Sequence, residues 1–171
     1  SLDGVGIVCD YGHNPASLEQ ICAAMARLPH DRLTAVYSAA GDRRDDDILD
    51  QGRMLGRLFD RVVVYEDAYM RGRQPGEITA LISRGVREGM SAERPVEVSF
   101  GGTWAETAAA VLDGSRVGDL VLLQPDTIEQ TIPWLHARYG SRLKETTFDE
   151  LAGVTVAGPH DRQAGPGEFV E

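Results

Sequence analysis

Lysine is nearly missing from this chain of 171 residues, although basic charge is not. All of its 17 basic side chains except Lys144 are arginines. A reaction that needs a titratable or modified lysine therefore has one candidate, close to the C-terminal end, and lysine chemistry is not expected. Arginine instead offers a fixed charge and a planar fork of donors that suits carboxylates and phosphates.

Cysteine and long apolar runs are scarce as well. Cys9 lies in the first apolar run and Cys22 in the first helical pattern, without metal-ligand spacing or a disulfide framework. We expect ordinary buried thiols in a reducing, cytoplasmic environment. No stretch approaches the roughly 18 apolar residues of a membrane span, and no signal peptide precedes Ser1. A start with serine, almost inside the first strand, predicts a piece of a longer protein.

Several common motifs are also missing. The sequence has no GxxxxGK[ST] loop, no GxGxxG after the first strand, no nucleophile elbow and no metal-ligand cluster. A net charge of −10 argues against nucleic-acid and membrane-surface partners, because their phosphates would be repelled. If the chain contacts a nucleotide, we expect it to form the second wall of a cleft whose phosphate-binding wall lies in an upstream domain.

What the sequence does contain is a regular alternation of apolar runs and helical patterns. Such alternation with short connections predicts one α/β domain, a Rossmann-like, doubly wound and mostly parallel sheet of five or six strands. The run with alternating polar residues, 96–100, is expected nearer the sheet edge. The predicted strands are 5–9, 33–38, 62–65, 96–100, 120–123 and a further one at 146–148, and helical patterns start at Pro15, near Asp45, at Pro75, at Trp104 and after Asp126, the last interrupted at Pro133.

The domain is expected to cover residues 1–157. Residues 158–171 are rich in glycine, proline and charge and show no apolar period, so we predict a disordered tail or a segment that belongs to a partner.

The unusual residues follow the carboxyl ends of the predicted strands, where ligands bind in open α/β sheets. Residues 10–14, 39–44, 66–73 and 101–103 occupy these positions. We call the surface formed by these residues the rim. We expect its arginines to give it a local positive potential that suits phosphate or carboxylate groups. Each residue also has a plainer interpretation as a cap, a solvated turn or a helix-end charge, as for Asp45, Asp46 and Asp47. The four arginines concerned are Arg43, Arg44, Arg71 and Arg73.

Three of these stretches resemble the motifs of one family. Residues 10–15, DYGHNP, are similar to the DYAHNP motif that opens the C-terminal domain of the Mur ligases, the folylpolyglutamate synthetases and the cyanophycin synthetases. Residues 41–45, GDRRD, resemble the GDR motif that follows. Residues 66–73 resemble the EDxxxRGR of cyanophycin synthetases more than the DNPR of the peptidoglycan tripeptide ligases. The resemblance covers about residues 3–125.

The resemblance implies an ATP-dependent amide-bond ligase in which a central upstream domain binds ATP and Mg²⁺ and activates a carboxylate as an acyl phosphate. The C-terminal domain closes over ATP and binds the incoming amino acid, which for a cyanophycin-type reaction is arginine added to an aspartate side chain. Alone it is expected to be inactive. Carried over by position, ATP contacts fall on Asp10, His13 and Asn14, phosphate or substrate carboxylate contacts on Arg43, Arg44, Arg71 and Arg73, and guanidinium contacts on Asp42, Glu66 and Asp67.

Two departures from the family pattern stand out. Gly12 replaces the usual alanine, which lets the turn approach a neighbour closely. Gln124-Pro125-Asp126 replaces a glycine-containing ending of the fifth strand. A muramyl-peptide or folate ligase and a non-catalytic adaptor that binds carboxylates remain alternatives. A phospho-acceptor receiver is disfavoured, since it needs a lysine directly after the fifth strand, where this chain has Gln124-Pro125 and its only lysine, Lys144, lies twenty positions on.

Overall fold

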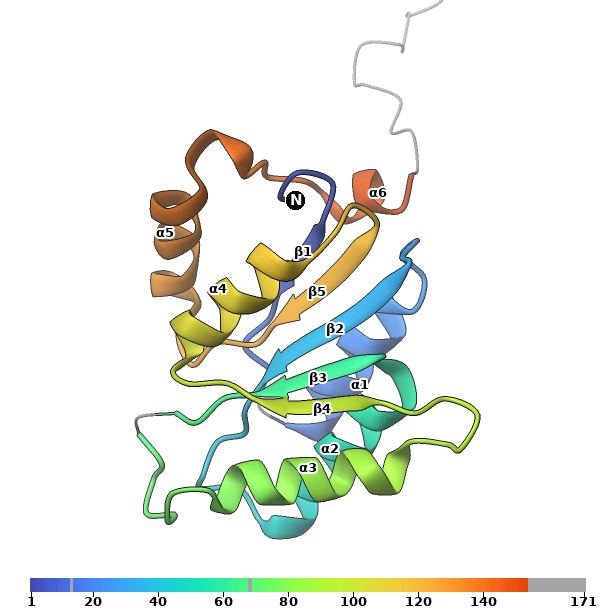
Figure 1. Cartoon of the computed structure of the whole chain (residues 1–171). Helices are drawn as coiled ribbons and strands as arrows, with labels where there is room; N and C mark the ends of the chain where they lie inside the picture. Colours follow the sequence, from blue (N-terminus) through green and yellow to red (C-terminus); the bar gives the residue numbers. More distant parts are fainter. Residues whose placement is uncertain (13, 68, 154–171) are drawn as a thin grey trace, which may run out of the picture.

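Five parallel strands form the single sheet of the computed structural model, which describes residues 1–12, 14–67 and 69–153. Their spatial order is β1-β5-β2-β3-β4, so that the first and fourth strands lie at the edges (Figure 1). The edge position expected for residues 96–100 is thereby confirmed, as is the α/β class. The strands are β1 (Gly6–Cys9), β2 (Arg32–Tyr37), β3 (Arg61–Val64), β4 (Glu97–Phe100) and β5 (Asp119–Leu123).

Helices cover both faces of this sheet (Figure 1). Three of them lie on one face and the next two on the other. Right-handed crossovers explain this for the first four helices, because the connections from β1 to β4 run one way across the sheet and the connection from β4 to β5 runs back. The first group is α1 (Pro15–Met25), α2 (Asp45–Leu58) and α3 (Glu77–Gly89), and the second is α4 (Trp104–Gly114) and α5 (Ile128–Tyr139); a short 3₁₀ turn, η1 (Gly140–Arg142), and α6 (Phe148–Leu151) follow.

Each face of the sheet has its own apolar core. Along β2, Leu33 and Tyr37 belong to the core under α1, α2 and α3, whereas Val36 belongs to the core under α4 and α5. All three side chains are fully buried. Burial on both faces explains why the central strands are continuous apolar runs rather than alternating ones.

Four glycines let α2 and α3 come into backbone contact. A Cβ placed on Gly52 would lie 2.5 Å from the carbonyl oxygen of Ile82, and one on Gly85 would lie 2.4 Å from that of Leu49. Gly56 and Gly89, one turn further along each helix, meet the opposite backbone in the same way. The two helices therefore pack closer than side chains would permit.

Three details of the sequence prediction are wrong. Residues 146–148 form no strand in the described chain. Instead, the Thr147 hydroxyl caps α6 by accepting a hydrogen bond from the Glu150 N–H, and the Glu150 carboxylate accepts one from the Thr147 N–H. α5 runs through Pro133 without interruption. α3 begins at Glu77, two residues after Pro75.

The predicted tail, residues 158–171, lies outside the described residues, and the domain boundary at 157 stays a prediction. Within the described part of the chain, no helix has both the length and the apolar character needed to cross a bilayer.

Candidate functional site

Gln124 joins the carboxyl ends of several strands at one point. Its side chain is 1% exposed, and its Oε1 accepts a hydrogen bond from the Ser38 N–H at 3.2 Å. Its carbonyl oxygen accepts one from the Tyr65 hydroxyl at 2.9 Å, and its N–H donates to the Val36 carbonyl oxygen at 3.0 Å. Gln124, which departs from the family pattern after β5, is therefore a buried residue that holds the ends of β2 and β3 in place.

The turn after β1 has its polar side chains committed to its own shape. Asp10 Oδ2 accepts a hydrogen bond from the Gly12 N–H at 3.0 Å, and Asn14 Oδ1 caps α1 by accepting from the Ser17 N–H at 2.9 Å. A Cβ on Gly12 would lie 2.6 Å from Asp10 Oδ2 and 2.8 Å from the Ser17 Cβ, so the glycine is needed within the turn itself, and the approach to a neighbour expected for it stays a prediction. His13 lies outside the described residues, and contacts of this turn with ATP stay a prediction.

Arg73 joins the second and third motif loops. Its Nε donates to the Gly41 carbonyl oxygen at 3.0 Å, and one terminal nitrogen donates to the Arg43 carbonyl oxygen at 2.6 Å. The other terminal nitrogen donates to Asp45 and to Glu77, both at 2.6 Å. The side chain is 15% exposed. Its hydrogen bond lowers the pKa of the Glu77 carboxyl.

The two loops also touch through their backbones. A Cβ on Gly41 would lie 2.1 Å from the Met70 carbonyl oxygen, so only glycine fits there. Four of the five N–H donors of the Arg73 guanidinium are used within the chain. Its geometry is that of a joint between loops, and contact with a substrate anion stays a prediction.

Of the other three rim arginines, Arg71 and Arg44 have acidic partners and Arg43 has none among the described residues. Arg71 lies 3.2 Å from Asp42 and 3.6 Å from Asp126. The Arg44 guanidinium forms a bidentate ion pair with the Asp47 carboxylate, with hydrogen bonds of 2.9 and 3.1 Å, and these bonds lower the pKa of Asp47. Arg43 is exposed, and its side chain has no hydrogen bond or ion pair with the described residues.

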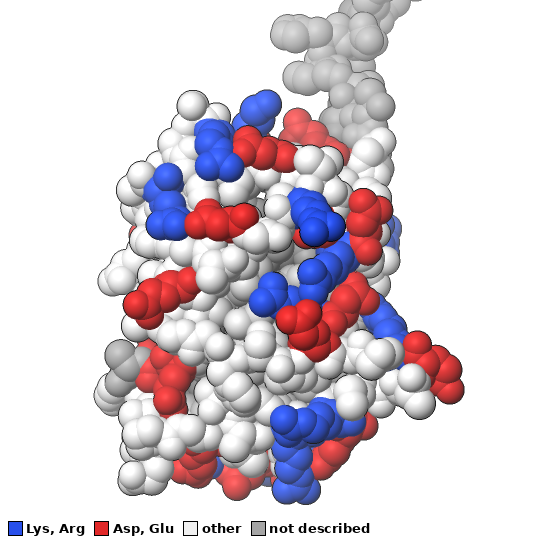
Figure 2. Space-filling view, viewed as in Figure 1, with Lys and Arg blue, Asp and Glu red and all other residues white. Residues whose placement is uncertain are grey.

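The rim is consequently mixed in charge rather than positive. On the left of Figure 2, where the strands of Figure 1 end, the coloured side chains are mainly red. Asp45, Asp46 and Asp47 occupy the first turn of α2, as the plainer interpretation expected. The described residues contain no group of three or more histidine, cysteine, aspartate or glutamate side chains that could hold a metal ion.

The three predicted guanidinium ligands do not form one group. Asp42 pairs with Arg71. Glu66 accepts a hydrogen bond from the Gly76 N–H, and Asp67 accepts one from the Tyr69 N–H at 3.0 Å. Of the three, Glu66 and Asp67 line a hollow at the carboxyl ends of the strands.

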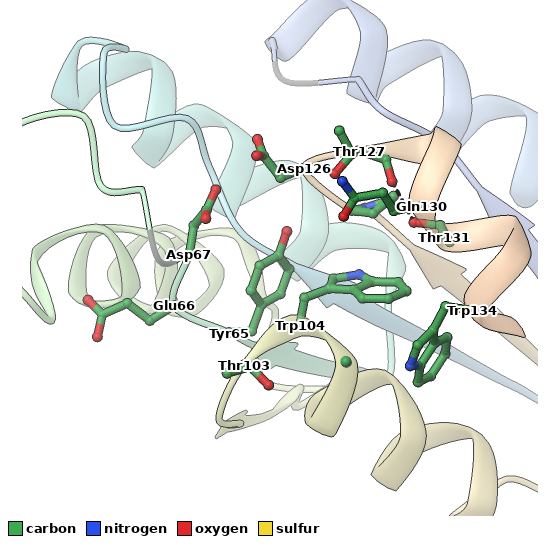
Figure 3. A pocket seen from close by; sticks show the side chains of 12 residues that line it. Tyr65, Glu66, Asp67, Thr103, Trp104, Asp126, Thr127, Gln130, Thr131 and Trp134 are labelled. Atoms are coloured by element: carbon green, nitrogen blue, oxygen red, sulfur yellow. Dashed lines mark hydrogen bonds between the residues drawn. The ribbon is translucent and has the colours of Figure 1, made fainter. Parts of the chain in front are cut away.

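That hollow is a cavity of about 550 Å³ between the N-terminal ends of α4 and α5, next to the end of β3 (Figure 3). Sequence reasoning missed it, because it depends on two helices lying side by side on one face of the sheet. The signal present was a tryptophan in each of the two helical patterns. Its lining is Tyr65, Glu66, Asp67, Thr103, Trp104, Ala105, Pro125, Asp126, Thr127, Gln130, Thr131 and Trp134.

Known proteins resemble this chain in sequence and in fold. Cyanophycin synthetase of Trichormus variabilis is 31% identical over 156 residues, which are 91% of this chain and 17% of that protein. The UDP-N-acetylmuramoyl-L-alanyl-D-glutamate–2,6-diaminopimelate ligase of Corynebacterium glutamicum is 31% identical over 117 residues, 68% of this chain and 22% of that one. The chain thus spans about a fifth of the relatives that it matches.

Solved structures share the fold at low identity. A UDP-N-acetylmuramoyl-L-alanyl-D-glutamate–2,6-diaminopimelate ligase superimposes with a TM-score of 0.62 at 18% identity, covering 81% of this chain and 31% of that one. FolC of E. coli in complex with ADP gives a TM-score of 0.57 at 19% identity, covering 77% and 29%. Residues 1–127 match the family described as "Mur ligase, glutamate ligase domain". The chain therefore belongs to the Mur ligase family, as a domain of the glutamate ligase type.

Proposed function

We propose that this chain is the C-terminal domain of an ATP-dependent amide-bond ligase of the cyanophycin synthetase type. In the proposed reaction, the γ-phosphoryl group of ATP passes to an oxygen of an aspartate side-chain carboxylate and ADP leaves. The amine of the incoming arginine then attacks the acyl carbon, phosphate leaves and the new amide nitrogen loses a proton. The domain closes over ATP and binds the amino acid, while an upstream domain binds the ATP phosphates and Mg²⁺.

One observation carries this proposal: the three motif loops meet at the carboxyl ends of the strands, in a chain whose sequence has no phosphate-binding loop. The second and third loops are joined by Arg73 and by the contact of Gly41 with Met70. The first is tied to β5, since the Asp10 N–H donates to the Leu123 carbonyl oxygen at 3.1 Å. Such a surface can align substrates held by another domain, and acyl-phosphate chemistry needs alignment and fixed charge more than a strong base.

The similarity to cyanophycin synthetases supports arginine as the incoming amino acid. The similarity to a diaminopimelate ligase supports a second candidate, a muramyl-peptide ligase. The two candidates differ in the charge of the incoming side chain, because arginine brings a guanidinium and diaminopimelate brings a second ammonium and carboxylate.

The test uses the complete protein from which this chain derives, because the domain alone is expected to show no turnover. Phosphate release from ATP is measured with an aspartate-containing peptide acceptor and either arginine or diaminopimelate. Release that requires arginine and the acceptor together supports the proposal. Release with a muramyl-peptide acceptor and diaminopimelate supports the second candidate, and substrate binding without any turnover supports an adaptor.

A rim variant connects this domain to the turnover. Arg71→Ala in the complete protein is expected to lower kcat/KM by about tenfold or more, the equivalent of one lost charge-assisted contact. Arg84→Ala is the matched control, because Arg84 is an exposed arginine of α3 that pairs with Glu88 at 2.8 Å, away from the rim. Equal rates for both variants would remove Arg71 from the site.

A further inference from the structure

The residue that follows β5 lies between two of the motif loops. β5 is flanked by β1 and β2 in the sheet, so Gln124 enters the space between the turn after β1 and the loop after β2 (Figure 1). Its side chain spans that space, because Oε1 accepts a hydrogen bond from the Ser38 N–H at 3.2 Å and Nε2 donates one to the Tyr11 carbonyl oxygen at 3.5 Å. One buried amide thus links the first motif to the strand end that leads into the second.

The chemistry of an amide matches both partners. A main-chain N–H faces one end of the group and a main-chain carbonyl oxygen faces the other, so the side chain must accept at one end and donate at the other. A carboxylate would present a second acceptor to the Tyr11 carbonyl oxygen, and an apolar side chain would pair with neither group. Because Gln124 is buried, water cannot easily replace a lost partner.

The turn after β1 has few hydrogen bonds that fix its place in the domain. The bond between Asp10 and Gly12 and the cap that Asn14 forms on α1 determine the shape of the turn. Its place is set by the bond of the Asp10 N–H to β5 and by a hydrogen bond of its tyrosine side chain to an arginine of the third motif loop. Gln124 adds a bond to the main chain at the Tyr11 carbonyl oxygen, beyond the last residue that β5 holds.

We propose that Gln124 is a positioning residue for the first motif. By holding the Tyr11 carbonyl oxygen at a fixed distance from the Ser38 N–H, it keeps the turn after β1 in the orientation in which the motif contacts the nucleotide. The choice of a nucleotide as the ligand of this turn rests on the proposed function. Gln124 acts only through the main-chain groups that it bonds, so its substitution changes where the motif lies and leaves the charges of the rim as they are.

Gln124→Met tests this role in the complete protein, since methionine keeps the volume of the side chain and removes both of its hydrogen bonds. We expect the KM for ATP to rise about tenfold and the KM for the incoming amino acid to change by less than about twofold. A purely structural role would instead lower the fraction of folded protein, which reduces the maximal rate and leaves both KM values unchanged.

Gln51→Met is the matched control. Gln51 is also fully buried, accepts a hydrogen bond from the Tyr37 hydroxyl at 2.7 Å and donates one to the Asp47 carbonyl oxygen at 3.0 Å. Its substitution removes as many hydrogen bonds from the core under α1, α2 and α3, so it should lower the melting temperature without raising the KM for ATP. An unchanged KM for ATP in Gln124→Met, or the same rise in both variants, would overturn the proposal.

Gln124→Glu makes the same link depend on pH. The protonated carboxyl has the shape of the amide and can donate to the Tyr11 carbonyl oxygen while it accepts from the Ser38 N–H, whereas the ionised carboxylate has no donor. The KM for ATP, divided by that of the wild type at the same pH, should be close to one at low pH and rise about tenfold as the carboxyl ionises. A ratio that does not vary with pH contradicts the proposal, and Gln51→Glu should show no such variation.

The introduced carboxyl is the group whose ionisation this ratio reports. Burial raises the pKa of Tyr37 and of Tyr65, so both neighbouring hydroxyls stay neutral. The charged side chains near Gln124 are present in the wild type too, so the ratio removes the effect of their titration. Since most of them are acidic, they and the burial should raise the pKa of the introduced carboxyl. These side chains are Asp10, Asp67, Arg71 and Asp126.

Amide hydrogen exchange separates this inference from the proposed function, because it requires no turnover. In Gln124→Met the amides of Asp10 and Gly12 should exchange about tenfold faster than in the wild type, and in Gln51→Met they should not. Faster exchange in a complete protein without ligase activity would leave the positioning of the turn standing and contradict the ligase. Unchanged exchange, or faster exchange with an unchanged KM for ATP, would leave the ligase standing and contradict the role of Gln124.

Discussion

Arg73 shows how one side chain can organise a surface without facing it. Its guanidinium reaches two backbone carbonyl oxygens of the loop after β2 and two carboxylates at the starts of α2 and α3. A lysine could supply the charge but not the fork, because one ammonium cannot satisfy acceptors in a planar array. The residue type is thus explained by geometry inside the chain.

Arg73→Ala is expected to lower the free energy of unfolding by about 1–2 kcal/mol, through the lost hydrogen bonds to the Gly41 and Arg43 carbonyl oxygens. Its larger effect should be local: amide hydrogen exchange in residues 41–45 and 70–77 should accelerate, and Arg73→Lys should restore only part of the protection. Arg84→Ala is again the control. Unchanged exchange in both loops would show that the joint is dispensable.

The two cysteines are expected to make the stability of the domain depend on pH. Burial raises the pKa of Cys9 and of Cys22 to about 11, from a usual value of 9.0. The stability that these thiols contribute is therefore complete below pH 9.0 and is lost as the pH rises toward about 11.

Alkylation by iodoacetamide, followed by mass spectrometry near pH 8, tests this prediction. The folded protein should react about a hundredfold more slowly than the chain in denaturant, because the thiolate is the reactive form. Similar rates in both states would mean that the thiols are accessible and ionise normally.

At the scale of elements, the contact of α2 with α3 is the most demanding. Gly85→Ala would place a methyl group 2.4 Å from the Leu49 carbonyl oxygen, so the helices must move apart, at a cost of about 1–3 kcal/mol. Gly114→Ala is the matched control: it is the last residue of α4, an added Cβ would meet no atom of another element within 4 Å, and the variant should be neutral or stabilising by less than about 1 kcal/mol. Urea unfolding of both variants measures the difference, and equal midpoints would refute the close packing.

Most elements could be predicted from periodicity because both cores impose it. The continuous apolar strands and the proline at the start of α1 required no tertiary information. The failures lie where a local cap or a neighbour decides. The Thr147-x-x-Glu150 pattern is a capping box, and it could have identified α6 in place of a strand. Pro133 removes one backbone hydrogen bond from α5, yet the helix continues through it, with Thr131, Leu135 and Tyr139 buried on either side of the proline.

At the scale of the whole molecule, the first residues of the chain are tied to residues 142–144, which follow α5. Leu2, 3% exposed, belongs to the core under α4 and α5 and bridges to Leu143. The Ser1 amino group donates to the Lys144 carbonyl oxygen at 2.6 Å, and Arg142 pairs with Asp3 at 2.6 Å. The first residues are therefore part of the domain.

Leu2→Ala should destabilise the domain by about 2–4 kcal/mol, the usual cost of truncating a buried leucine. Val117→Ala, at a residue 75% exposed, should change the stability by less than about 0.5 kcal/mol. Chemical denaturation followed by circular dichroism measures both. A small loss in Leu2→Ala would show that the N-terminal residues detach without affecting the core.

The position of the candidate site was predictable for the same reason as the fold. Parallel strands bring their carboxyl ends to one edge, so the motif loops had to meet. What could not be predicted is how the charges there are partnered, since Arg71 and Arg73 find carboxylates from loops distant in sequence. The aromatic cavity was equally hidden, because it arises between two helices whose contact no local pattern specifies.

The strand order also governs how this domain can be made. β1 is the first strand to be synthesised, but its partner in the sheet is β5, the last. During translation the apolar residues of β1 stay unpaired until nearly the whole domain has been synthesised. This delay slows folding and leaves an aggregation-prone segment exposed. The turn at Asp10 takes its place only when Leu123 arrives to accept its N–H. A ribosome-bound intermediate that stops before β5 should therefore hold α2 and α3 against a partial sheet, with the first motif still unformed.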